Sequence, residues 1–555
     1  MESTISIFCK NNQTQQTFPA GVSLMEVYEQ MQPSLLYPVA CATVNNKIES
    51  LTYACYKSKD VKFLDVSDPA GMRIYVKSLC FVMAKAVHDL FPDAKLYIEH
   101  GLSRGYYCEV ETGQTLTYSI VKQIKRHMQA LIAADLPFEE HERPTPEVIA
   151  LFEHFGMSDK AHLLQTTGEA YSTYYTLDGY PDSFYGGLLP STSHIYLFDI
   201  ERYRKGILLR IPNRNIPFRL EPYVNQEKMS AVFREWRQFQ KALNLSNVGE
   251  LNQCIIKDDI ATIVQVAEIV QEKQIGKIAD EICQRYESGV RVVLIAGPSS
   301  SGKTTFCKRL HLELLANTLR PHSISLDDYY LNRVDTPLDA EGNYDYESLY
   351  AIDLQKFNED LKQILAGAKV DLPSYDFPSG TRVYRGDSIQ LGDRSILIME
   401  GIHGLNPSLV PNIPPSSIYK IYVSALTSIS LDDHNWIPTT DNRLLRRIVR
   451  DHRFRGCVAK ETISRWASVR KGEDKWIFPY QENADAMFNS AMLYELAALR
   501  DIAEPVLKEV SPMDDEYSEA HRLLQFLQFF KSIDQSVLPS TSLLREFVGG
   551  SSFKY

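Results

Sequence analysis

One stretch constrains the fold of this chain more than any other: residues 291–305, which read RVVLIAGPSSSGKTT. The apolar run at 292–296 predicts a buried parallel strand, and the G-x-x-x-x-G-K-[ST] pattern that follows is typical of a phosphate-binding loop. The glycines of such a loop let backbone N–H groups turn inward at the start of a helix, where they bind an anion. We therefore expect a parallel α/β sheet in this region and a bound nucleoside triphosphate, ATP.

The loop combines a backbone cradle with two chemical side chains. The Lys303 side chain is expected to reach the β- and γ-phosphates, and the Thr304 hydroxyl is expected to hold Mg²⁺. An ordinary Gly/Ser-rich turn is the alternative, but a strand-like run precedes the loop and the helical pattern FCKRLHLELLANTL follows it. The predicted ATP-binding set is Gly297, Pro298, Ser299, Ser300, Ser301, Gly302, Lys303, Thr304 and Thr305.

Length and net charge limit the number of domains and the kinds of partner that we expect. Its 555 residues predict several domains, because single cores stop growing at about 250–300 residues. A hydrophobic content of 44% and a charged content of 23% are ordinary for a globular protein. The net charge of −11 argues against broad nonspecific binding to nucleic acid.

Cysteine usage and apolar runs bear on location. The nine cysteines are dispersed and include no C-x-x-C pair, which favours reduced thiols over a disulfide framework. No signal-peptide pattern is evident, and no run approaches the roughly 18 apolar residues of a membrane span. We expect a cytoplasmic protein with no membrane partner.

Strand and helix patterns divide the chain into five predicted segments. Short β-type runs around one helical stretch open the chain, residues 67–73 read as a linker, and a long amphipathic helix is expected from Ile74 to Leu90. Alternating strand and helix patterns after Val290 predict a doubly wound parallel sheet. The predicted segments are 1–66, a mixed β-grasp-like domain; 67–225, an α+β domain; 226–287, a helical connector; 288–510, the phosphate-binding-loop unit; and 511–555, one helix and a tail.

Carboxylates follow two further strand-like runs. HSISLDDYY places Asp327 and Asp328 just after the second run, where either could accept a proton from an attacking hydroxyl or simply cap a helix. Glu400 ends the buried run SILIME, a position suited to orienting Mg²⁺ or its water. A surface glutamate at a strand end is the alternative for Glu400.

Residues of about 288–500 resemble the uridine kinase branch of the uridine kinase and phosphoribulokinase family. Four segments carry the resemblance, in the family's order: SLDDYY, GNYDYESLYAID, LPSYDFPSGTR and DNRLLRRIVRD. It implies an ATP- and Mg²⁺-dependent nucleoside kinase that phosphorylates the 5′-hydroxyl. The roles it implies are Asp327 as catalytic base, Tyr330 at the substrate, Asp345 on the ribose hydroxyls, Tyr375 and Phe377 around the base, Arg382 near the site, Arg447 and Arg450 on the phosphates, and Arg455 in the lid.

The resemblance breaks at two positions. The family histidine that meets the pyrimidine edge falls on Gly380, and a lid arginine falls on Cys457. We expect an enlarged pocket at Gly380 that could admit another base or a non-nucleoside alcohol. Restoring histidine at 380 is then expected to change the base preference.

Residues of about 1–225 resemble the N-terminal region of threonyl-tRNA synthetases, a TGS domain followed by an editing domain. The segments VNNKIESL, FPDAKLYIEHGLSRGYYCEV and SFYGGLLPSTSHIYLFDI carry this resemblance. The four polar positions of the editing site fall on Lys77, Phe81, Phe184 and Leu188. Apolar side chains cannot bind zinc, so we do not expect an editing hydrolase, and His100 and His194 are read as structural.

Three functions remain open at this point. A nucleoside kinase leads, because aromatic and acidic residues suit a nucleoside. A kinase of another small alcohol, similar to phosphoribulokinase or pantothenate kinase, is the first alternative, and an RNA-binding regulatory ATPase is the second. The amino-terminal half could bind RNA or a nucleotide regulator or mediate dimer contacts, and we expect a homo-oligomer.

Overall fold

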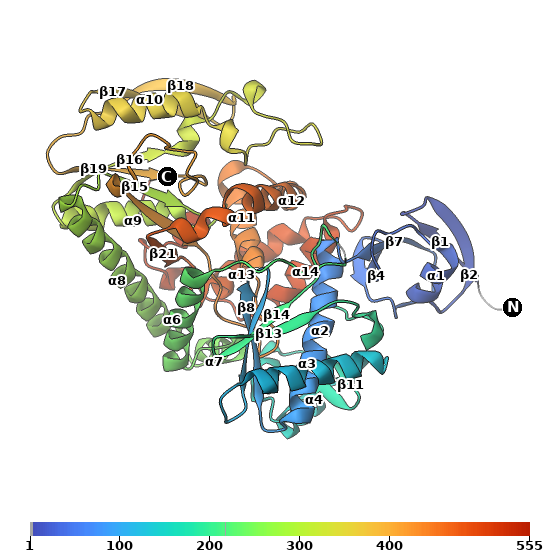
Figure 1. The fold of residues 1–555 in the computed structure, drawn as a ribbon. Helices are drawn as coiled ribbons and strands as arrows, with labels where there is room; N and C mark the ends of the chain where they lie inside the picture. Colours follow the sequence, from blue (N-terminus) through green and yellow to red (C-terminus); the bar gives the residue numbers. More distant parts are fainter. Residues whose placement is uncertain (1–3, 217, 555) are drawn as a thin grey trace.

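The computed structural model describes residues 4–216 and 218–554. Residues 1–3 and 555, at the outer ends of the first and last predicted segments, and residue 217 lie outside this description. Within the described ranges, no helix is both long enough and apolar enough to cross a membrane. Figure 1 shows the amino-terminal sheet at the right of the molecule, an α+β region in its lower part, and the sheet of the carboxyl-terminal half with its helices at the upper left.

The chain opens with a five-stranded mixed sheet and one short helix. Strand β1 pairs antiparallel with β2 and parallel with β7, which gives the order β2-β1-β7-β4-β5. Helix α1 starts with a capping box at Ser23 and buries Leu24 and Val27 in the core of this sheet. The arrangement fits the predicted β-grasp fold. The bounds are β1 Thr4–Cys9, β2 Thr14–Pro19, α1 Leu24–Met31, β4 Val39–Val44, β5 Lys47–Glu49 and β7 Lys59–Asp65.

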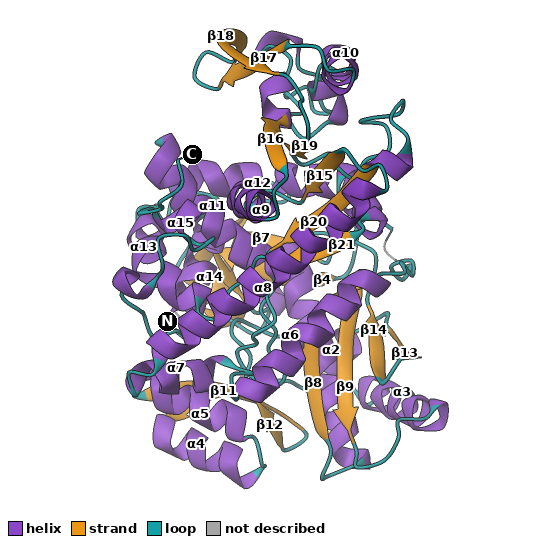
Figure 2. Cartoon of the chain, turned by 90° about the vertical axis from the view of Figure 1, so that its left-hand side faces the viewer, coloured by secondary structure: helices purple, strands orange, loops and turns teal. Residues whose placement is uncertain are grey.

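A long buried helix, α2, organises the next region (Figure 2). Helix α2 spans Pro69–Leu90 and is capped by the Asp68 side chain, so most of the expected linker is helical. Its middle is buried on nearly all sides, because the sheet β13-β14-β9-β8 and several helices surround it. The neighbouring elements are β8 Lys95–Leu102, β9 Gly105–Glu111, α3 Tyr118–Ala133, β10 Glu139–Pro144, α4 Thr145–His154, α5 Ser158–Thr167, β11 Tyr171–Leu177, β12 Tyr180–Asp182, β13 Asp199–Tyr203 and β14 Gly206–Arg210.

Three helices fill the segment predicted as a helical connector. They are α6 Glu227–Leu243, α7 Val248–Ile256 and α8 Ile260–Glu287. Val264 and Ile282 of α8 lie in the same core as Phe306 of the following region. This segment is therefore a structural layer of the carboxyl-terminal half as well as a connection.

The carboxyl-terminal half is built on a five-stranded parallel sheet of order β16-β19-β15-β20-β21. Both faces are covered, because Val293 and Ile295 of β15 face one core and Val292 and Leu294 face another. This confirms the predicted doubly wound sheet. The main elements are β15 Val292–Ala296, α9 Lys303–Ala316, β16 Arg320–Ser325, α10 Leu354–Leu365, β17 Val370–Asp376, β18 Thr381–Ile389, β19 Ser395–Glu400, β20 Ile418–Ser424, α11 Thr439–Arg455, α12 Ala459–Trp476, β21 Ala486–Asn489 and α13 Glu495–Lys508.

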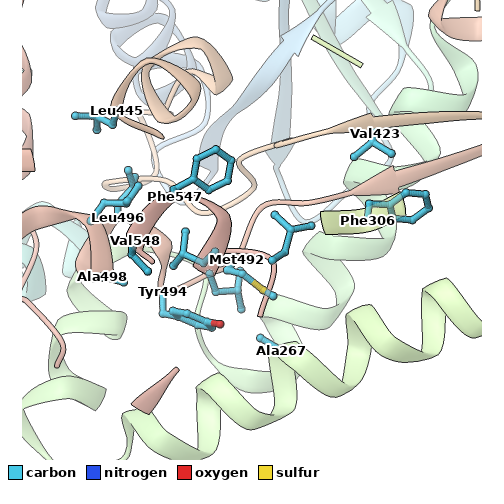
Figure 3. Close-up of a cluster of buried hydrophobic side chains, with 14 of the residues drawn as sticks. Ala267, Phe306, Val423, Leu445, Met492, Tyr494, Leu496, Ala498, Phe547 and Val548 are labelled. Atoms are coloured by element: carbon cyan, nitrogen blue, oxygen red, sulfur yellow. The ribbon is translucent and has the colours of Figure 1, made fainter. Parts of the chain in front are cut away.

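The last segment is more structured than expected. Besides the predicted helix, which is α14 Tyr517–Leu527, it contains the short helix α15 Arg545–Val548. Figure 3 shows Phe547 and Val548 packed among core side chains of the carboxyl-terminal half, including Leu445 and Leu496. The tail is thus part of the core.

A buried ion network joins the two halves of the chain. Lys160 of α5 lies 2.8 Å from an Asp182 carboxylate oxygen and 2.9 Å from one of Asp432. The His434 ring lies 2.7 Å from Asp182. The charges of Lys160 and His434 lower the pKa of the Asp182 carboxyl to about 2, because their effect outweighs that of burial. Charges buried in this way need fixed partners, so the network holds the halves in one relative position.

Candidate phosphate-transfer site

The backbone of the loop after β15 has the shape of an anion cradle. Ser300 has a φ of +57° and Gly302 a φ of +81°, and left-handed residues alternating with right-handed ones in a turn direct N–H groups inward. A side chain at Gly297 would overlap the Val423 carbonyl oxygen, so only glycine fits there. Helix α9 begins at Lys303, directly after the loop, and adds the positive end of its dipole.

The loop carries buried polar groups that the protein itself leaves unsatisfied. Among the described residues, the Ser300 and Ser301 hydroxyl oxygens are buried and have no hydrogen-bond partner. The buried Lys303 ammonium donates to the Pro298 carbonyl at 3.2 Å. Unpaired donors are costly to bury, and phosphate oxygens would satisfy them. The residues present therefore fit the triphosphate of ATP.

Arginines of helix α11 close around the loop. Arg443 donates to the Ser299 carbonyl at 2.9 Å, and Arg447 donates to the Ser299 hydroxyl at 2.9 Å. Arg446 contacts the Ser300 carbonyl at 3.4 Å. Arg447 was predicted from the sequence, whereas Arg443 and Arg446 were not, although their spacing of three and four residues places all three on one helix face.

A buried glutamate binds the loop from the other side. Glu473 of α12 accepts a hydrogen bond from the Ser299 N–H at 3.2 Å. It also pairs with Arg443 and, at 2.6 Å, with Arg470. Sequence reasoning missed Glu473, because its partners at the loop and on α11, Ser299 and Arg443, lie 174 and 30 residues away.

The two aspartates after β16 have different surroundings. Burial raises the pKa of the Asp327 carboxyl, and the charges of Lys303, Arg455 and Arg450 oppose the shift. Asp328 instead accepts a hydrogen bond from the Tyr375 N–H at 3.1 Å, which ties it to strand β17. Asp327 therefore faces the cationic side of the loop, and Asp328 supports the neighbouring hairpin.

Glu400 lies at the end of β19, beside the loop. The Thr304 hydroxyl donates to its carboxylate at 3.4 Å. Burial raises the pKa of Glu400 to about 7; Lys303 opposes this shift, and the carboxylates of Asp327 and Glu546 add to it. Lys303 therefore does not fully offset the burial of the Glu400 carboxylate. A hydroxyl and a carboxylate next to the phosphate oxygens of a nucleotide would be a set of oxygen ligands that suits Mg²⁺. Within the described ranges, no three His, Cys, Asp or Glu side chains are grouped to hold a metal ion alone.

Three aromatic rings line the side of the site next to Asp327. The Tyr330 and Tyr375 rings lie 5.8 Å apart, and the Tyr375 and Phe377 rings 5.1 Å apart, both edge to face. Tyr375 is buried and Phe377 is half exposed. The structure thus brings together the three aromatic residues that the sequence predicted around a substrate.

The expected enlargement at Gly380 is absent, because the Arg333 side chain fills that space. A Cβ on Gly380 would lie 2.8 Å from the Arg333 Nε atom. Arg333 also donates to the Phe377 carbonyl at 2.7 Å. Gly380 has a φ of +70°, so a histidine there would meet both a collision and backbone strain. A histidine at 380 would first have to displace Arg333, and the expected change of base preference stays a prediction.

The other predicted residues lie at different distances from the centre. Arg382 forms an ion pair with Asp353 at 2.8 Å, at the start of α10. Arg450 and Arg455 contact Asp451 at 2.7 and 3.7 Å. The Asp345 N–H donates to the Pro337 carbonyl at 2.7 Å.

Glu347, two residues after Asp345, lies closer to the centre and was missed. Burial and the Glu473 charge raise its pKa to about 7, and Arg447 and Lys303 oppose the shift. Its Oε2 atom is buried and has no hydrogen-bond partner among the described residues. The only sequence signal was a second acidic residue in NYDYES.

Residues 292–496 match the family model described as the phosphoribulokinase / uridine kinase family. This part of the chain is a kinase domain of that family. The domain is 19% identical to a solved structure described as a possible uridine kinase from Bacillus stearothermophilus, with a TM-score of 0.26, over 38% of this chain and 97% of that chain. A D-glycerate 3-kinase from Cryptococcus neoformans is 16% identical, with a TM-score of 0.22, over 46% of this chain and 87% of that chain.

The amino-terminal half matches a different class of protein. The chain is 30% identical over 192 residues to a threonine–tRNA ligase from Syntrophomonas wolfei, which is 34% of this chain. It spans 30% of that ligase's length. The kinase domain is therefore joined to a region that is similar to about a third of a threonine–tRNA ligase.

The four positions that the resemblance assigns to an editing site, Lys77, Phe81, Phe184 and Leu188, lie in one packed region. The Phe81 and Phe184 rings lie 5.4 Å apart, and Phe81 also contacts Phe138 and Tyr180. We call these four rings the aromatic site. Next to it, Lys77 donates to the Tyr185 carbonyl, and its ammonium lies 3.6 Å from the Tyr185 ring. Leu188 belongs to the same core.

The two remaining histidines near this region have structural surroundings. The His100 ring stacks on Phe233 at 3.8 Å, and burial lowers its pKa to about 3. His194 lies 3.0 Å from the Ser191 hydroxyl. The His100 Nε2 atom is buried and has no hydrogen-bond partner among the described residues, so the structural role of the two histidines stays a prediction.

Proposed function

We propose that the kinase domain transfers the γ-phosphate of ATP to a hydroxyl of a small molecule, and that the acceptor is the 5′-hydroxyl of a nucleoside. One observation carries the proposal. Three neighbouring parallel strands each bring one functional group to the same edge of the sheet. The loop with Lys303 follows β15, Asp327 follows β16, and Glu400 is the last residue of β19. Ligands of doubly wound sheets bind at this carboxyl edge.

The residues of the chain divide the work of transfer among them. Asp327 would accept the proton of the acceptor hydroxyl, since its raised pKa makes it a better base than an ordinary aspartate. The negative charge on the transferred phosphate would be stabilised by four cationic side chains: Lys303, Arg447, Arg450 and the lid residue Arg455. Thr304 and Glu400 would hold Mg²⁺, which neutralises charge between the phosphates when bound.

Aromatic and acidic side chains support a nucleoside as the acceptor. Tyr375 and Phe377 present ring faces and edges for a base, with Tyr330 beside them. Glu347 lies nearer the transfer centre than the sequence-based candidate for the ribose hydroxyls, Asp345, and we propose that both serve the sugar. Arg382 would then orient the hairpin through Asp353.

A substrate panel tests this function. Purified protein is incubated with ATP, Mg²⁺ and each of the common nucleosides, sugars and small hydroxy acids, and ADP release is measured. We expect release with a nucleoside and 5′-monophosphate as product. Release with a non-nucleoside alcohol alone would favour the phosphoribulokinase-like alternative, and no stimulated release would overturn the proposal.

A second candidate concerns the amino-terminal half. Its similarity to threonine–tRNA ligase supports binding of RNA or a nucleotide regulator, with the kinase domain acting as a regulatory ATPase. Titration with tRNA at physiological salt tests this. Tight binding together with no phosphorylated nucleoside would favour it over the kinase.

Two further proposals concern the state of the protein. All nine cysteines are free thiols, which supports a cytoplasmic location. We also propose a homo-oligomer and keep the five predicted segment boundaries as domain boundaries. Light scattering of the purified protein measures the oligomeric state.

A further inference from the structure

The C-terminal tail reaches the phosphate-binding loop. Glu546 of α15 accepts two hydrogen bonds from Thr305, one from the N–H at 3.1 Å and one from the hydroxyl at 2.7 Å. Thr305 directly follows Thr304, the last residue of the G-x-x-x-x-G-K-[ST] motif, and lies in the first turn of helix α9. The donors of this turn are those that a loop of this type offers to the phosphates of a nucleotide.

Apolar anchors seat the tail firmly against the loop. Leu543 and Phe547 are fully buried. A Cβ on Gly302 would touch the Leu543 side chain, so Leu543 covers the loop backbone. The guanidinium of Arg446, which also contacts the Ser300 carbonyl, lies 4.9 Å from the centre of the Phe547 ring.

The tail is also folded on itself around one side chain. Arg545 donates to the carbonyls of Leu538 at 2.6 Å, Gln535 at 2.8 Å and Gly549 at 3.2 Å. Charge-assisted bonds to backbone carbonyls order a short segment that has little secondary structure. The residues on either side of Glu546 are therefore held in place, and its carboxylate is presented to Thr305.

The carboxylate and a phosphate compete for the same donors. Both are anions, and two anions cannot share one N–H and one hydroxyl at hydrogen-bond distance. Glu546 also adds to the negative surroundings of Glu400, so its charge extends to the proposed Mg²⁺ position. The nucleotide must displace this carboxylate before its own phosphate can bind Thr305.

We propose that residues 535–549 are a built-in competitor of the nucleotide, with Glu546 standing on the loop in place of a phosphate group. The inference rests on the proposed function only in requiring that the loop binds a nucleoside triphosphate. A competitor of this kind lowers the apparent affinity by the fraction of molecules in which the loop is free. The tail thereby sets the ATP concentration at which the enzyme works.

The first test measures ATP binding directly, by calorimetry of the full chain with no acceptor present. Glu546→Gln removes the charge and keeps the shape, so we expect ATP to bind about five- to twentyfold more tightly. Asp515→Asn removes an equal charge from an exposed position of the same segment and should leave the affinity unchanged. Unchanged or weaker ATP binding by Glu546→Gln would overturn the inference, because Glu546 would then be neutral or part of the site.

The second test uses the unmodified protein. Hydrogen exchange of residues 542–549 is measured with and without saturating ATP, and we expect faster exchange with ATP as the carboxylate leaves Thr305. Equal exchange in both states would overturn the inference. If wild type binds ATP but the Glu546→Gln affinity is unchanged, only this inference fails. If neither protein binds ATP, the proposed function fails, and this inference fails with it.

Discussion

The phosphate-binding loop and the aromatic site treat buried polar groups in opposite ways. At the loop, the Ser300 and Ser301 hydroxyls lack partners, and the pKa of Glu400 is raised to about 7. At the aromatic site, ring packs on ring, and the neighbouring Lys77 side chain is bound to a carbonyl. Buried polar groups without partners lower stability, so their presence at the loop indicates a functional role. Closely packed rings at the aromatic site are explained by core packing alone.

The difference also separates two inherited regions by what they have kept. In the kinase domain, Lys303, Asp327 and Glu400 lie together at the carboxyl edge of the sheet. The ligase-like half keeps the fold, but apolar side chains stand where metal ligands would be needed. Replacing a ligand by a well-packed phenylalanine turns a binding site into a core.

The largest effect should separate two buried lysines, Lys303 at the loop and Lys77 beside the aromatic site. Lys303→Ala removes a cation from the transferred charge, so we expect kcat to fall by about 10³-fold or more. Lys77→Met should leave kcat unchanged, because Lys77 lies by the aromatic site and burial already holds its pKa well below its usual range. ADP release at saturating ATP measures both variants, and thermal melts confirm that each is folded. Equal losses in the two variants would break the comparison.

A smaller effect should separate the two aspartates after β16. We expect Asp327→Asn to bind ATP normally and to lose about 10²–10⁴-fold in kcat, as for a removed general base. Asp328→Asn is the matched control and should retain most turnover, because Asp328 supports the Tyr375 backbone. Near-normal turnover in Asp327→Asn with loss in Asp328→Asn would transfer the base role to Asp328.

The smallest effect concerns stability and pH. Glu347 has its pKa raised from 4.5 to about 7, so the folded state favours the protonated form. The stability it contributes is present below pH 4.5 and is lost as the pH rises through 7. Between pH 5 and pH 8, the wild type should lose about 1–2 kcal/mol of unfolding free energy more than Glu347→Gln.

Urea unfolding at the two pH values measures that difference. Glu341→Gln is the control, because Glu341 is an exposed residue of the same segment that pairs only at the surface with Lys471. It should show the pH dependence of the wild type. If the Glu347→Gln variant shows the same pH dependence of the unfolding free energy as the wild type, burial at the loop does not raise the pKa of Glu347.

Local patterns were predictable because their causes are local. The apolar run before Gly297, the glycines of the loop and the helix after it lie within one strand–loop–helix unit. The carboxylates Asp327 and Glu400 were placed correctly at strand ends because parallel strands bring their carboxyl ends to one edge. Helix α2 began earlier than expected, since Asp68 caps it and Pro69 suits a first turn.

Contacts between distant residues were not predictable. Arg333 fills the space at Gly380 although 47 positions separate the two in the sequence, and the pocket there was expected to be larger. Glu473 and Glu347 reach the loop through side-chain packing of α12 and of an irregular segment. No periodicity or motif reports such packing, because it depends on which surfaces meet.

The sequence by itself determined which residue types stand at the phosphate-binding loop and at the editing-like positions. Residue types at fixed spacing make a phosphate cradle, and the same reasoning shows that phenylalanine and leucine cannot bind zinc. Only the tertiary structure showed that a carboxylate binds Thr305 beside the loop, because Glu546 lies 241 residues from Thr305 in the chain. The contact exists because buried Leu543 and Phe547 hold the tail against the core, and burial of this kind is a property of the whole fold.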